Sequence, residues 1–365
     1  MIKPVLNIMK VLLLCESGPL GLKVLYCLKG MNAFVQTTGP RGARMLKYSR
    51  YANGHSEVQF WQDGVPSTTT QQLLRERVEA ENFDVILPSD MASAAFLAAT
   101  KKVYPDLPCF PCGDQVTLDT LHNKWSFAQT CTKYGLPIPP TVLLESIDQL
   151  DTSILDPVGF PLIIKPLEAE SSHGVVRLDN LQALRMYIER DTGYARLPLI
   201  AQTYIPGRDI DISILAANDR ILCNTVQSWL DGGVLEFTQH PEMYAIATRL
   251  VKTFHYEGLA HFDMRIDTRD GKLYVIECNP RAWYTISASM WQGLNFIEMG
   301  IHYTKTGTIP ELSAKAGEGR YCLAGSLWKQ LLSPRTGWKN ISAGSVLGFI
   351  QAITDPLPHL YSKIR

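Results

Sequence analysis

Short hydrophobic runs alternate with amphipathic stretches over roughly the first 110 residues. The run at 11–15 is apolar throughout, which is typical of a buried strand, and 22–28 has the spacing of an amphipathic helix. The same succession recurs at "AFVQTTG" and at "FDVILPSD", which leads into the Ala-rich stretch "MASAAFLAATKK". This alternation predicts a doubly wound parallel sheet. Ligands of such sheets bind beyond the carboxyl ends of the strands, here near 16–21 and Asp90.

The pattern changes after Thr117. "LDTLHNKWSFAQTCTKYG" has helical periodicity and ends at Gly135, a residue type that commonly terminates helices. "GFPLIIKPLEAESSHGVVRL" then predicts a strand, a loop and a second strand. "LIAQTYIPGRDIDISILAAN" predicts a further pair of strands around a Pro-Gly turn.

The densest chemical signal is a predicted hairpin that carries acidic side chains. Its first strand holds Asp263, its turn bends at Gly271, and its second strand holds Glu277 and Asn279. Mg²⁺ prefers oxygen ligands and is usually held by one or two carboxylates together with substrate phosphates. Arg281 adds a fork of donors suited to a phosphate or a carboxylate. The alternative interpretation is a solvated sheet edge, since acidic residues are mostly exposed.

A second set of residues is suited to phosphate binding. Lys165 ends a predicted buried strand, where an ammonium group is costly unless it meets an anion. The loop "EAESSHGV" follows, with hydroxyl groups and a glycine that permits close approach of a ligand. The backbone at 203–205 is positioned to contact an adenine edge, and Asp209 to accept from ribose hydroxyls. A mobile hairpin with a solvent-reaching lysine is the alternative.

Composition limits the class of protein. The 365 residues are 46% hydrophobic and 19% charged, so the chain has enough apolar material for two or three compact domains. Because the formal net charge is zero, neither a nucleic acid nor an anionic membrane is an expected partner. No apolar run has the length of a membrane span, and we expect a cytoplasmic protein. The eight cysteines show no disulfide or zinc pattern, and Cys278 is expected in the core rather than as a nucleophile.

These motifs, in this order, resemble the ATP-grasp superfamily, within it the carboxylate-amine ligase type similar to carbamoyl-phosphate synthetase domains and D-alanine–D-alanine ligase. The resemblance covers 10–305 and lies in the ordered set rather than in any single stretch. It implies an α/β (α+β) fold with an N-terminal doubly wound parallel domain, a small central lid and a C-terminal antiparallel-sheet domain. The expected divisions are 1–112 for the N-terminal domain, 113–196 for the lid, 197–310 for the C-terminal domain with the metal site, and 311–365 for a helical extension.

The resemblance also implies roles for individual residues. The implied nucleotide-binding residues are Lys124, Lys165, Glu168, Ser171, Ser172, Gly174, Val175, Gln202, Thr203, Tyr204, Ile205 and Asp209. The implied metal ligands are Asp263, Glu277 and Asn279, and the implied catalytic residues are Arg265, Arg281 and Lys165. The chain departs from the family pattern at Gln202 and Asp209, where glutamate is usual, and at Trp229, which suggests a more apolar acceptor pocket.

The implied activity is ATP-dependent joining of a carboxylate to an amine through an acyl phosphate, with release of ADP and phosphate. The cofactors are ATP and Mg²⁺, with Mn²⁺ as the alternative metal. The expected partners are a small carboxylic acid and an amine, with an amino acid favoured, and a homodimer is compatible with the extension. A kinase-like enzyme that stops at a phosphorylated product remains open, as does a non-catalytic ATP-binding module. A nicotinamide oxidoreductase is disfavoured because "SGPLG" lacks the glycine spacing of a dinucleotide fingerprint.

Overall fold

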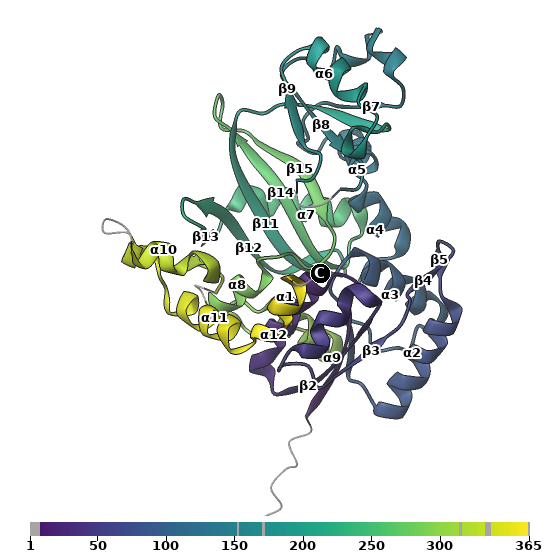
Figure 1. Cartoon of the computed structure of the whole chain (residues 1–365), viewed down its shortest axis with the longest axis vertical. Coiled ribbons are helices and arrows are strands. Elements are labelled where there is room, and N and C mark those ends of the chain that lie inside the picture. Colours follow the sequence, from purple (N-terminus) through teal and green to yellow (C-terminus); the bar gives the residue numbers. More distant parts are fainter. Residues whose placement is uncertain (1–7, 152, 170–171, 314–315, 333–336, 364–365) are drawn as a thin grey trace, which may run out of the picture.

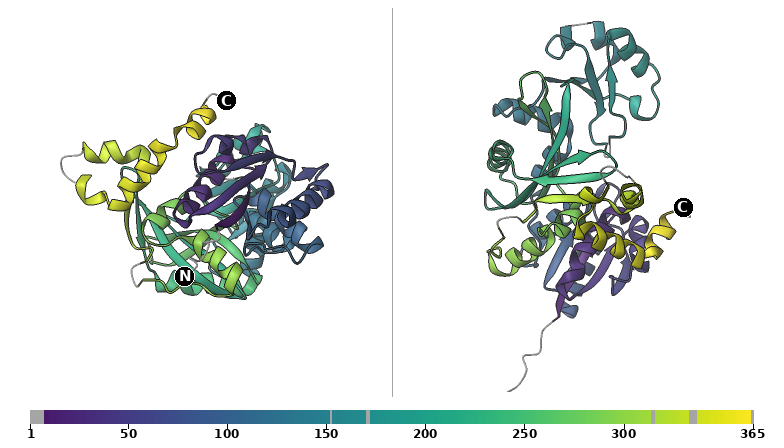
Figure 2. Two further views of the ribbon diagram at one scale, coloured as in Figure 1. Left: turned by 90° about the horizontal axis from the view of Figure 1, so that it is seen from below. Right: turned by 90° about the vertical axis from the view of Figure 1, so that its left-hand side faces the viewer.

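The chain folds around three main sheets. The computed structural model describes residues 8–151, 153–169, 172–313, 316–332 and 337–363. Figure 1 shows a small domain at the top, a large antiparallel sheet in the middle and an N-terminal α/β layer at the bottom. The right-hand view in Figure 2 shows the same small domain standing away from the rest of the molecule.

The N-terminal sheet confirms the predicted parallel α/β alternation. Its strand order is β3-β2-β1-β6, and all of its strand pairs are parallel. The sheet consists of β1 (Met9–Leu14), β2 (Ala33–Gly39), β3 (Gly54–Glu57) and β6 (Val85–Pro88), connected in part by α1 (Gly18–Leu28) and α2 (Thr68–Glu81) and followed by α3 (Met91–Val103). A separate short hairpin is made by β4 (Trp61–Gln62) and β5 (Val65–Pro66). The central strand β1 is buried because it is paired on both edges and apolar on both faces.

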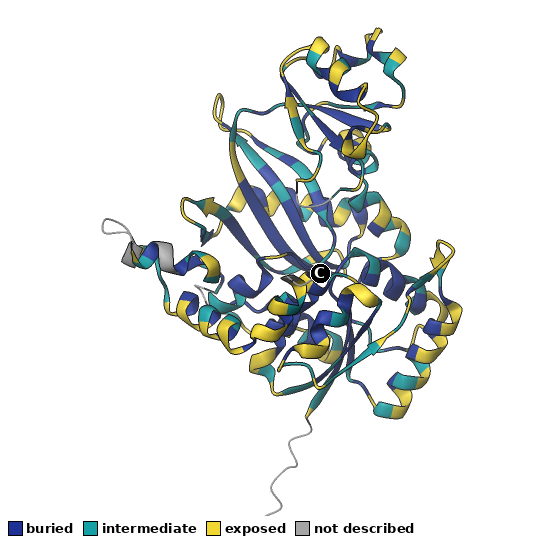
Figure 3. Cartoon of the chain, viewed as in Figure 1, coloured by how far each residue is buried: buried dark blue, intermediate teal, exposed yellow. Residues whose placement is uncertain are grey.

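The C-terminal sheet is antiparallel, with the strand order β15-β14-β11-β12-β13-β16. Its strands are β11 (Gly207–Ala217), β12 (Arg220–Leu230), β13 (Val234–Thr238), β14 (Gly258–Asp267), β15 (Leu273–Asn279) and β16 (Gly319–Cys322). The helices of this part are α7 (Pro241–Phe254), α8 (Ile286–Trp291) and α9 (Phe296–Thr306). Figure 3 shows that the middle strands of this sheet are largely buried. The sheet confirms the predicted antiparallel arrangement of this half.

The small domain at the top of Figure 1, which we call the lid, has its own sheet and core. Its antiparallel strand order is β7-β10-β8-β9. The strands are β7 (Thr141–Leu144), β8 (Leu162–Pro166), β9 (Val176–Leu178) and β10 (Leu199–Thr203), and α6 (Leu181–Ile188) packs with them. Strand β10 extends past the expected lid boundary at residue 196, since it pairs with β7 and β8 rather than with the C-terminal sheet.

The single helix expected from Thr117 to Gly135 is instead two helices. They are α4 (Gln115–His122) and α5 (Lys124–Lys133), separated at Asn123, whose side chain caps α5 by accepting from the next two backbone N–H groups. We expected both helices in the lid, but Leu118 and Phe127 belong to the hydrophobic core that also holds the C-terminal sheet. The amphipathic pattern predicts a buried helical face but not the core against which that face packs.

The last 55 residues, expected as a helical extension, also contribute strand β16 to the edge of the C-terminal sheet. The helices there are α10 (Leu327–Leu331), α11 (Ala343–Thr354) and α12 (Pro356–Lys363). Helix α11 contacts α8, and α12 contacts the 3-10 helix Arg41–Tyr48 of the N-terminal domain. Among the described residues, no helix has both the length and the apolar character needed to cross a bilayer.

Candidate active site

A cavity of about 750 Å³ opens where the lid, the C-terminal sheet and the loop before α1 meet. Its walls include most of the residues that the sequence predicts for the site. The lining residues used below are Ser17, Leu20, Lys165, Ser172, Val175, Gln202, Asp209, Asp211, Gln227, Trp229, His261, Asp263, Glu277, Asn279, Arg281, Trp283, Tyr284 and Thr285. The segment 16–21, expected at a ligand crevice, contributes Ser17 and, from the start of α1, Leu20 to the wall of this cavity.

The predicted acidic hairpin is present, and its two strands bring the predicted oxygen ligands together. Asp263 on β14 lies opposite Glu277 on β15, and Asn279 donates from Nδ2 to Asp263 Oδ2 over 3.4 Å. The register shifts by one residue between Asp263 and Met264. This bulge lets Val275 remain in the core while the next residues, Ile276 and Glu277, both line the cavity.

The two carboxyl groups lie close together and are partly shielded from water. Burial and the negative charge of Asp263 raise the pKa of Glu277, whose side chain is 17% exposed. Burial acts to raise the pKa of Asp263 as well, but its contacts with His261 and Glu277 outweigh this and lower it. Two carboxylates and an amide oxygen on one cavity wall are a donor set that fits a hard divalent cation, which would remove this repulsion.

Lys165 lies in the lid and is almost completely buried. Its ammonium donates from Nζ to Gln202 Oε1 over 2.9 Å, and Gln202 in turn donates to Thr141 Oγ1 over 3.0 Å. Burial lowers the pKa of Lys165 to about 8, with the nearby Glu277 opposing this and the positive Lys124 adding to it. The amide at Gln202 therefore orients the lysine but contributes no charge, whereas the glutamate usual in the family would be ionised.

Lys124, the first residue of α5, contacts the loop that follows β8 and also the acidic hairpin. Its Nζ donates to the carbonyl of Ala169 over 2.8 Å and lies 3.4 Å from Glu277 Oε2. Beyond Ala169, the predicted loop residues Ser172 and Val175 line the cavity, and Gly174 has a φ of 73°, which favours glycine. Glu168 accepts from Asn123 over 3.1 Å and lines a neighbouring cavity instead. The predicted residue Ser171 lies outside the described residues.

The hinge segment after β10 is held by backbone hydrogen bonds. The N–H groups of Thr203 and Tyr204 donate to the carbonyls of Pro140 and Pro161. These two donors are therefore engaged inside the protein, and the segment 203–205 presents its remaining groups to the cavity.

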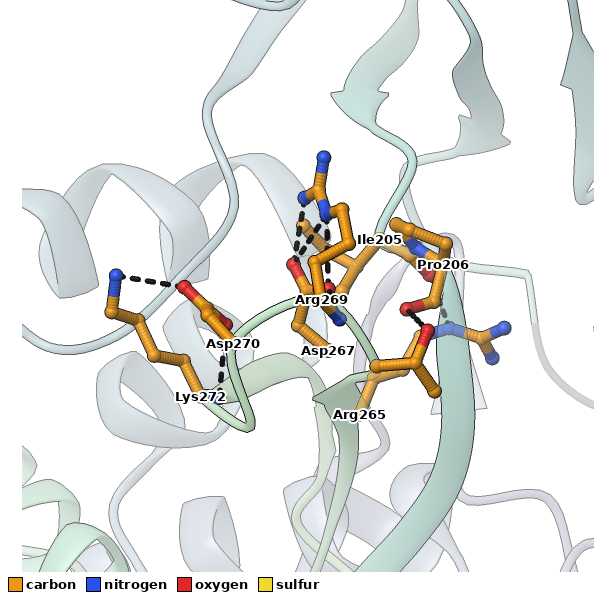
Figure 4. Close-up of polar contacts among 8 residues, drawn as sticks. Ile205, Pro206, Arg265, Asp267, Arg269, Asp270 and Lys272 are labelled. Carbon is orange, nitrogen blue, oxygen red and sulfur yellow. Dashed lines mark hydrogen bonds and ion pairs between the residues drawn. The ribbon is translucent and has the colours of Figure 1, made fainter.

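Arg265, a predicted catalytic residue, lines the cavity and also holds the hinge. Figure 4 shows its guanidinium beside Ile205, to whose carbonyl Nε donates over 2.6 Å. Nη2 donates to the carbonyl of Gly207 over 2.8 Å, and Nη1 pairs with Asp209. Asp209, expected at the ribose, is therefore committed to Arg265, with 70% of its side chain exposed. The nearby turn is closed by the pair of Asp267 and Arg269.

Arg281 and several aromatic side chains also line the cavity. Arg281 donates from Nη2 to Asn279 Oδ1 over 3.1 Å, which places its guanidinium beside the acidic hairpin. Trp229 is 51% exposed and lines the cavity, as do Trp283 and Tyr284.

Sequence reasoning missed a polar cluster beside the acidic hairpin. Asp211 on β11 and His261 on β14 both line the cavity, and His261 Nε2 lies 3.2 Å from Asp263 Oδ1 and 3.7 Å from Asp211 Oδ2. Burial raises the pKa of Asp211 to about 7. Burial acts to lower the pKa of His261, but the negative charges of Asp263 and Asp211 outweigh this effect, so the pKa of His261 is raised. The available signal was the two-residue spacing in "HFD" and "DID", which places both residues on the face of Asp263 and Asp209.

Comparison with known proteins agrees with this geometry. Residues 121–284 match the family model described as the ATP-grasp domain. This region contains both lysines, the lid, the hinge and the acidic hairpin. The match covers less than half of the chain, and over these residues the chain is similar to the ATP-grasp superfamily.

Three known proteins are similar to this chain. It is 25% identical over 278 residues to a D-aspartate ligase from Enterococcus faecium, covering 68% of this chain and 65% of that one. It is 30% identical over 113 residues to a D-alanine–D-alanine ligase from Petrotoga mobilis, covering 31% and 35%. The structure of an N5-carboxyaminoimidazole synthetase from Staphylococcus aureus complexed with ADP superposes with a TM-score of 0.64 at 15% identity, covering 84% and 79%. The chain thus spans less than two thirds of the length of these two curated relatives, while the structural likeness shows the ATP-grasp fold.

Proposed function

We propose that this protein is an ATP-dependent carboxylate-amine ligase, which activates a carboxylate as an acyl phosphate and joins it to an amine. One observation carries the proposal. A single cavity holds a pair of partly buried carboxylates, Asp263 and Glu277, together with the buried Lys165 and the guanidinium of Arg281. The names of the D-aspartate ligase and the D-alanine–D-alanine ligase support an amino acid as one substrate.

In this proposal, ATP enters between the lid and the C-terminal sheet. Lys165 and Lys124 neutralise phosphate charge, and the hinge at 203–205 contacts the base. Asp263, Glu277 and Asn279 would hold Mg²⁺, or Mn²⁺ as the alternative, which when bound balances the charge of the terminal phosphates. The loop 168–175 closes over the phosphates and excludes water.

Other residues of the cavity then position the substrates. Arg281 holds the carboxylate so that one of its oxygens attacks the γ-phosphorus, and ADP leaves as the oxygen–phosphorus bond forms. The amine attacks the carbonyl carbon of the acyl phosphate, phosphate leaves, and the nitrogen loses a proton to give the amide. The protein contributes mainly position and electrostatic stabilisation to such steps.

A screen for ADP release tests the proposal. Purified protein with ATP and Mg²⁺ is offered carboxylic acids and amines singly and in pairs, with amino acids in both roles. Release that requires both partners, with the amide found by mass spectrometry, supports ligation. Release with an acid or an amine alone indicates the kinase-like alternative, and nucleotide binding without turnover in any mixture indicates a binding module.

The variant Glu277→Gln tests the site assignment. It keeps the size of the side chain but removes a carboxylate, so we expect ADP formation to fall by about 100-fold or more, beyond the 10–100-fold typical of outer-shell metal partners. Glu242→Gln is the matched control. It makes the same substitution at an exposed residue of α7 and should keep full activity. Undiminished turnover in Glu277→Gln would remove this residue from the site.

A further inference from the structure

The cluster of Asp211, His261 and Asp263 has a geometry of its own. Each residue offers one ligand atom, and these atoms all lie within 4.8 Å of one another on the wall of the cavity. The imidazole Nε2 is 3.2 Å from one carboxylate and 3.7 Å from the other. Ligand atoms bonded to one divalent cation at about 2.0 to 2.2 Å lie roughly 3 to 3.6 Å apart. The distance to Asp263 falls in this range, and the distance to Asp211 is slightly longer, so a small shift of the Asp211 side chain would let the three residues share one ion.

The surroundings of the cluster hold its side chains in place. Ser213, opposite His261 in the sheet, lies 2.9 Å from its Nδ1, which allows Nδ1–H to donate to the hydroxyl while Nε2 presents its lone pair to the cavity. Gln227 donates from Nε2 to Asp211 Oδ2 over 3.4 Å, and its Oε1 accepts from the Thr285 hydroxyl over 2.9 Å. Metal-binding imidazoles and carboxylates in proteins are oriented by such partners.

The rest of the cavity does not explain this cluster. The oxygen set of Asp263, Glu277 and Asn279 serves the nucleotide's metal in the proposed function, and only Asp263 is common to both sets. Trp283 stacks on His261 at 5.6 Å between ring centroids with 14° between the planes, so the imidazole is fixed against a rigid apolar wall. Two carboxylates and one imidazole form a mixed oxygen and nitrogen site.

We propose that Asp211, His261 and Asp263 form a second divalent-cation site, selective for a first-row transition metal such as Mn²⁺ over Mg²⁺. An imidazole nitrogen suits transition metals, whereas Mg²⁺ strongly prefers oxygen ligands. Asp263 bridges this ion to the nucleotide's metal. The open coordination positions face the cavity, where they suit an oxygen of the substrate carboxylate.

Electron spin echo envelope modulation of Mn²⁺ bound to the nucleotide-free protein tests the proposal. The probe is Mn²⁺ alone, so the experiment needs no substrate and no turnover, and its failure leaves the ligase proposal standing. We expect modulation from a directly bound ¹⁴N nucleus in the wild-type spectrum. Bound Mn²⁺ without nitrogen modulation, or no bound Mn²⁺ at all, would overturn the site whatever the variants do.

Variants identify the nitrogen. His261→Gln should abolish the modulation, while His255→Gln should preserve it, because His255 is an exposed histidine that pairs with Asp219 elsewhere on the surface. Asp211→Asn should weaken Mn²⁺ binding by about tenfold or more and keep the modulation at saturating metal. Thermal unfolding of each variant checks that it is folded. Modulation that survives in folded His261→Gln assigns the nitrogen to another residue and contradicts the proposal.

Discussion

At the scale of single residues, the site is built from charges that the fold keeps out of water. Lys165 is 4% exposed and Lys124 is 7% exposed, yet each ammonium group has a polar partner. Lys165 meets the amide of Gln202, and Lys124 approaches the carboxylate of Glu277. A buried lysine whose nearest partner is neutral is held at a cost in stability, which an incoming phosphate would offset.

This arrangement predicts a pH dependence of nucleotide binding. The pKa of Lys165 is lowered to about 8, so above that pH the nucleotide-free protein has lost the proton that a phosphate would restore. We expect the affinity for ATP or ADP to be level below pH 8 and to fall by about tenfold per pH unit above it, since binding then requires proton uptake. Isothermal titration calorimetry from pH 6.5 to about 9.5 measures the change.

Lys165→Arg is the matched variant for this prediction. A guanidinium stays protonated throughout the range, so the decline above pH 8 should disappear even if the larger head group weakens binding at every pH. The same decline in both proteins would mean that another group controls the pH dependence.

At the scale of elements, the alternation in 261–267 and 273–279 is sufficient to predict that Asp263 meets Glu277 and Asn279. A period of two and a tight turn at Gly271 determine which side chains share a face. The bulge after Asp263 is not predictable in this way, because one extra residue changes the register without changing the pattern of apolar residues. Asp211 was missed for a related reason. Its pairing with Asp263 joins strands that are far apart in the sequence.

Strand β11 begins at Gly207, where the neighbouring strand leaves no room for a side chain. A Cβ on Gly207 would lie 1.8 Å from the backbone carbonyl oxygen of Ile266 on β14, and neither backbone can move without breaking the pairing. We expect Gly207→Ala to lower the free energy of unfolding by about 1 to 3 kcal/mol through overpacking. Chemical denaturation monitored by circular dichroism measures this.

The control for this prediction is Gly30→Ala. A Cβ on the exposed Gly30 would meet no heavy atom within 4 Å, so its effect should stay within about 0.5 kcal/mol. Equal stabilities of the two variants would contradict the close approach of β11 to β14.

At the scale of the whole molecule, the described N-terminal and C-terminal segments are packed into one body. Leu12 of β1 shares a core with Ile212 of β11, and Leu25 of α1 shares another with Phe296 of α9. Asp355, after α11, is 2% exposed and accepts from Ser49 Oγ and from the backbone N–H of Arg50. Arg50 therefore lies against the C-terminal segment.

The lid, in contrast, has a separate core, whose described buried residues run from Leu144 to Ala201. Its contacts with the body include the hydrogen bonds of Lys124 with the carbonyls of Leu167 and Ala169. Units with separate apolar cores open with separate free energies. The lid is therefore the part of the molecule whose position a ligand in the cavity is expected to control.

Native-state hydrogen exchange tests this division. Without nucleotide, we expect the amides of the lid strands β8 and β10 to exchange with a lower free energy of opening than those of β11 and β14. Saturating ADP with Mg²⁺ should slow exchange in 199–205 by about 100-fold at a hundredfold excess over its Kd, equivalent to about 2.7 kcal/mol, while β1 changes less. Lys165→Met should abolish this protection, because it removes the ammonium without opening the lid core. If lid and body amides exchange at one common free energy in the absence of nucleotide, the molecule opens as a single unit and the lid does not move independently.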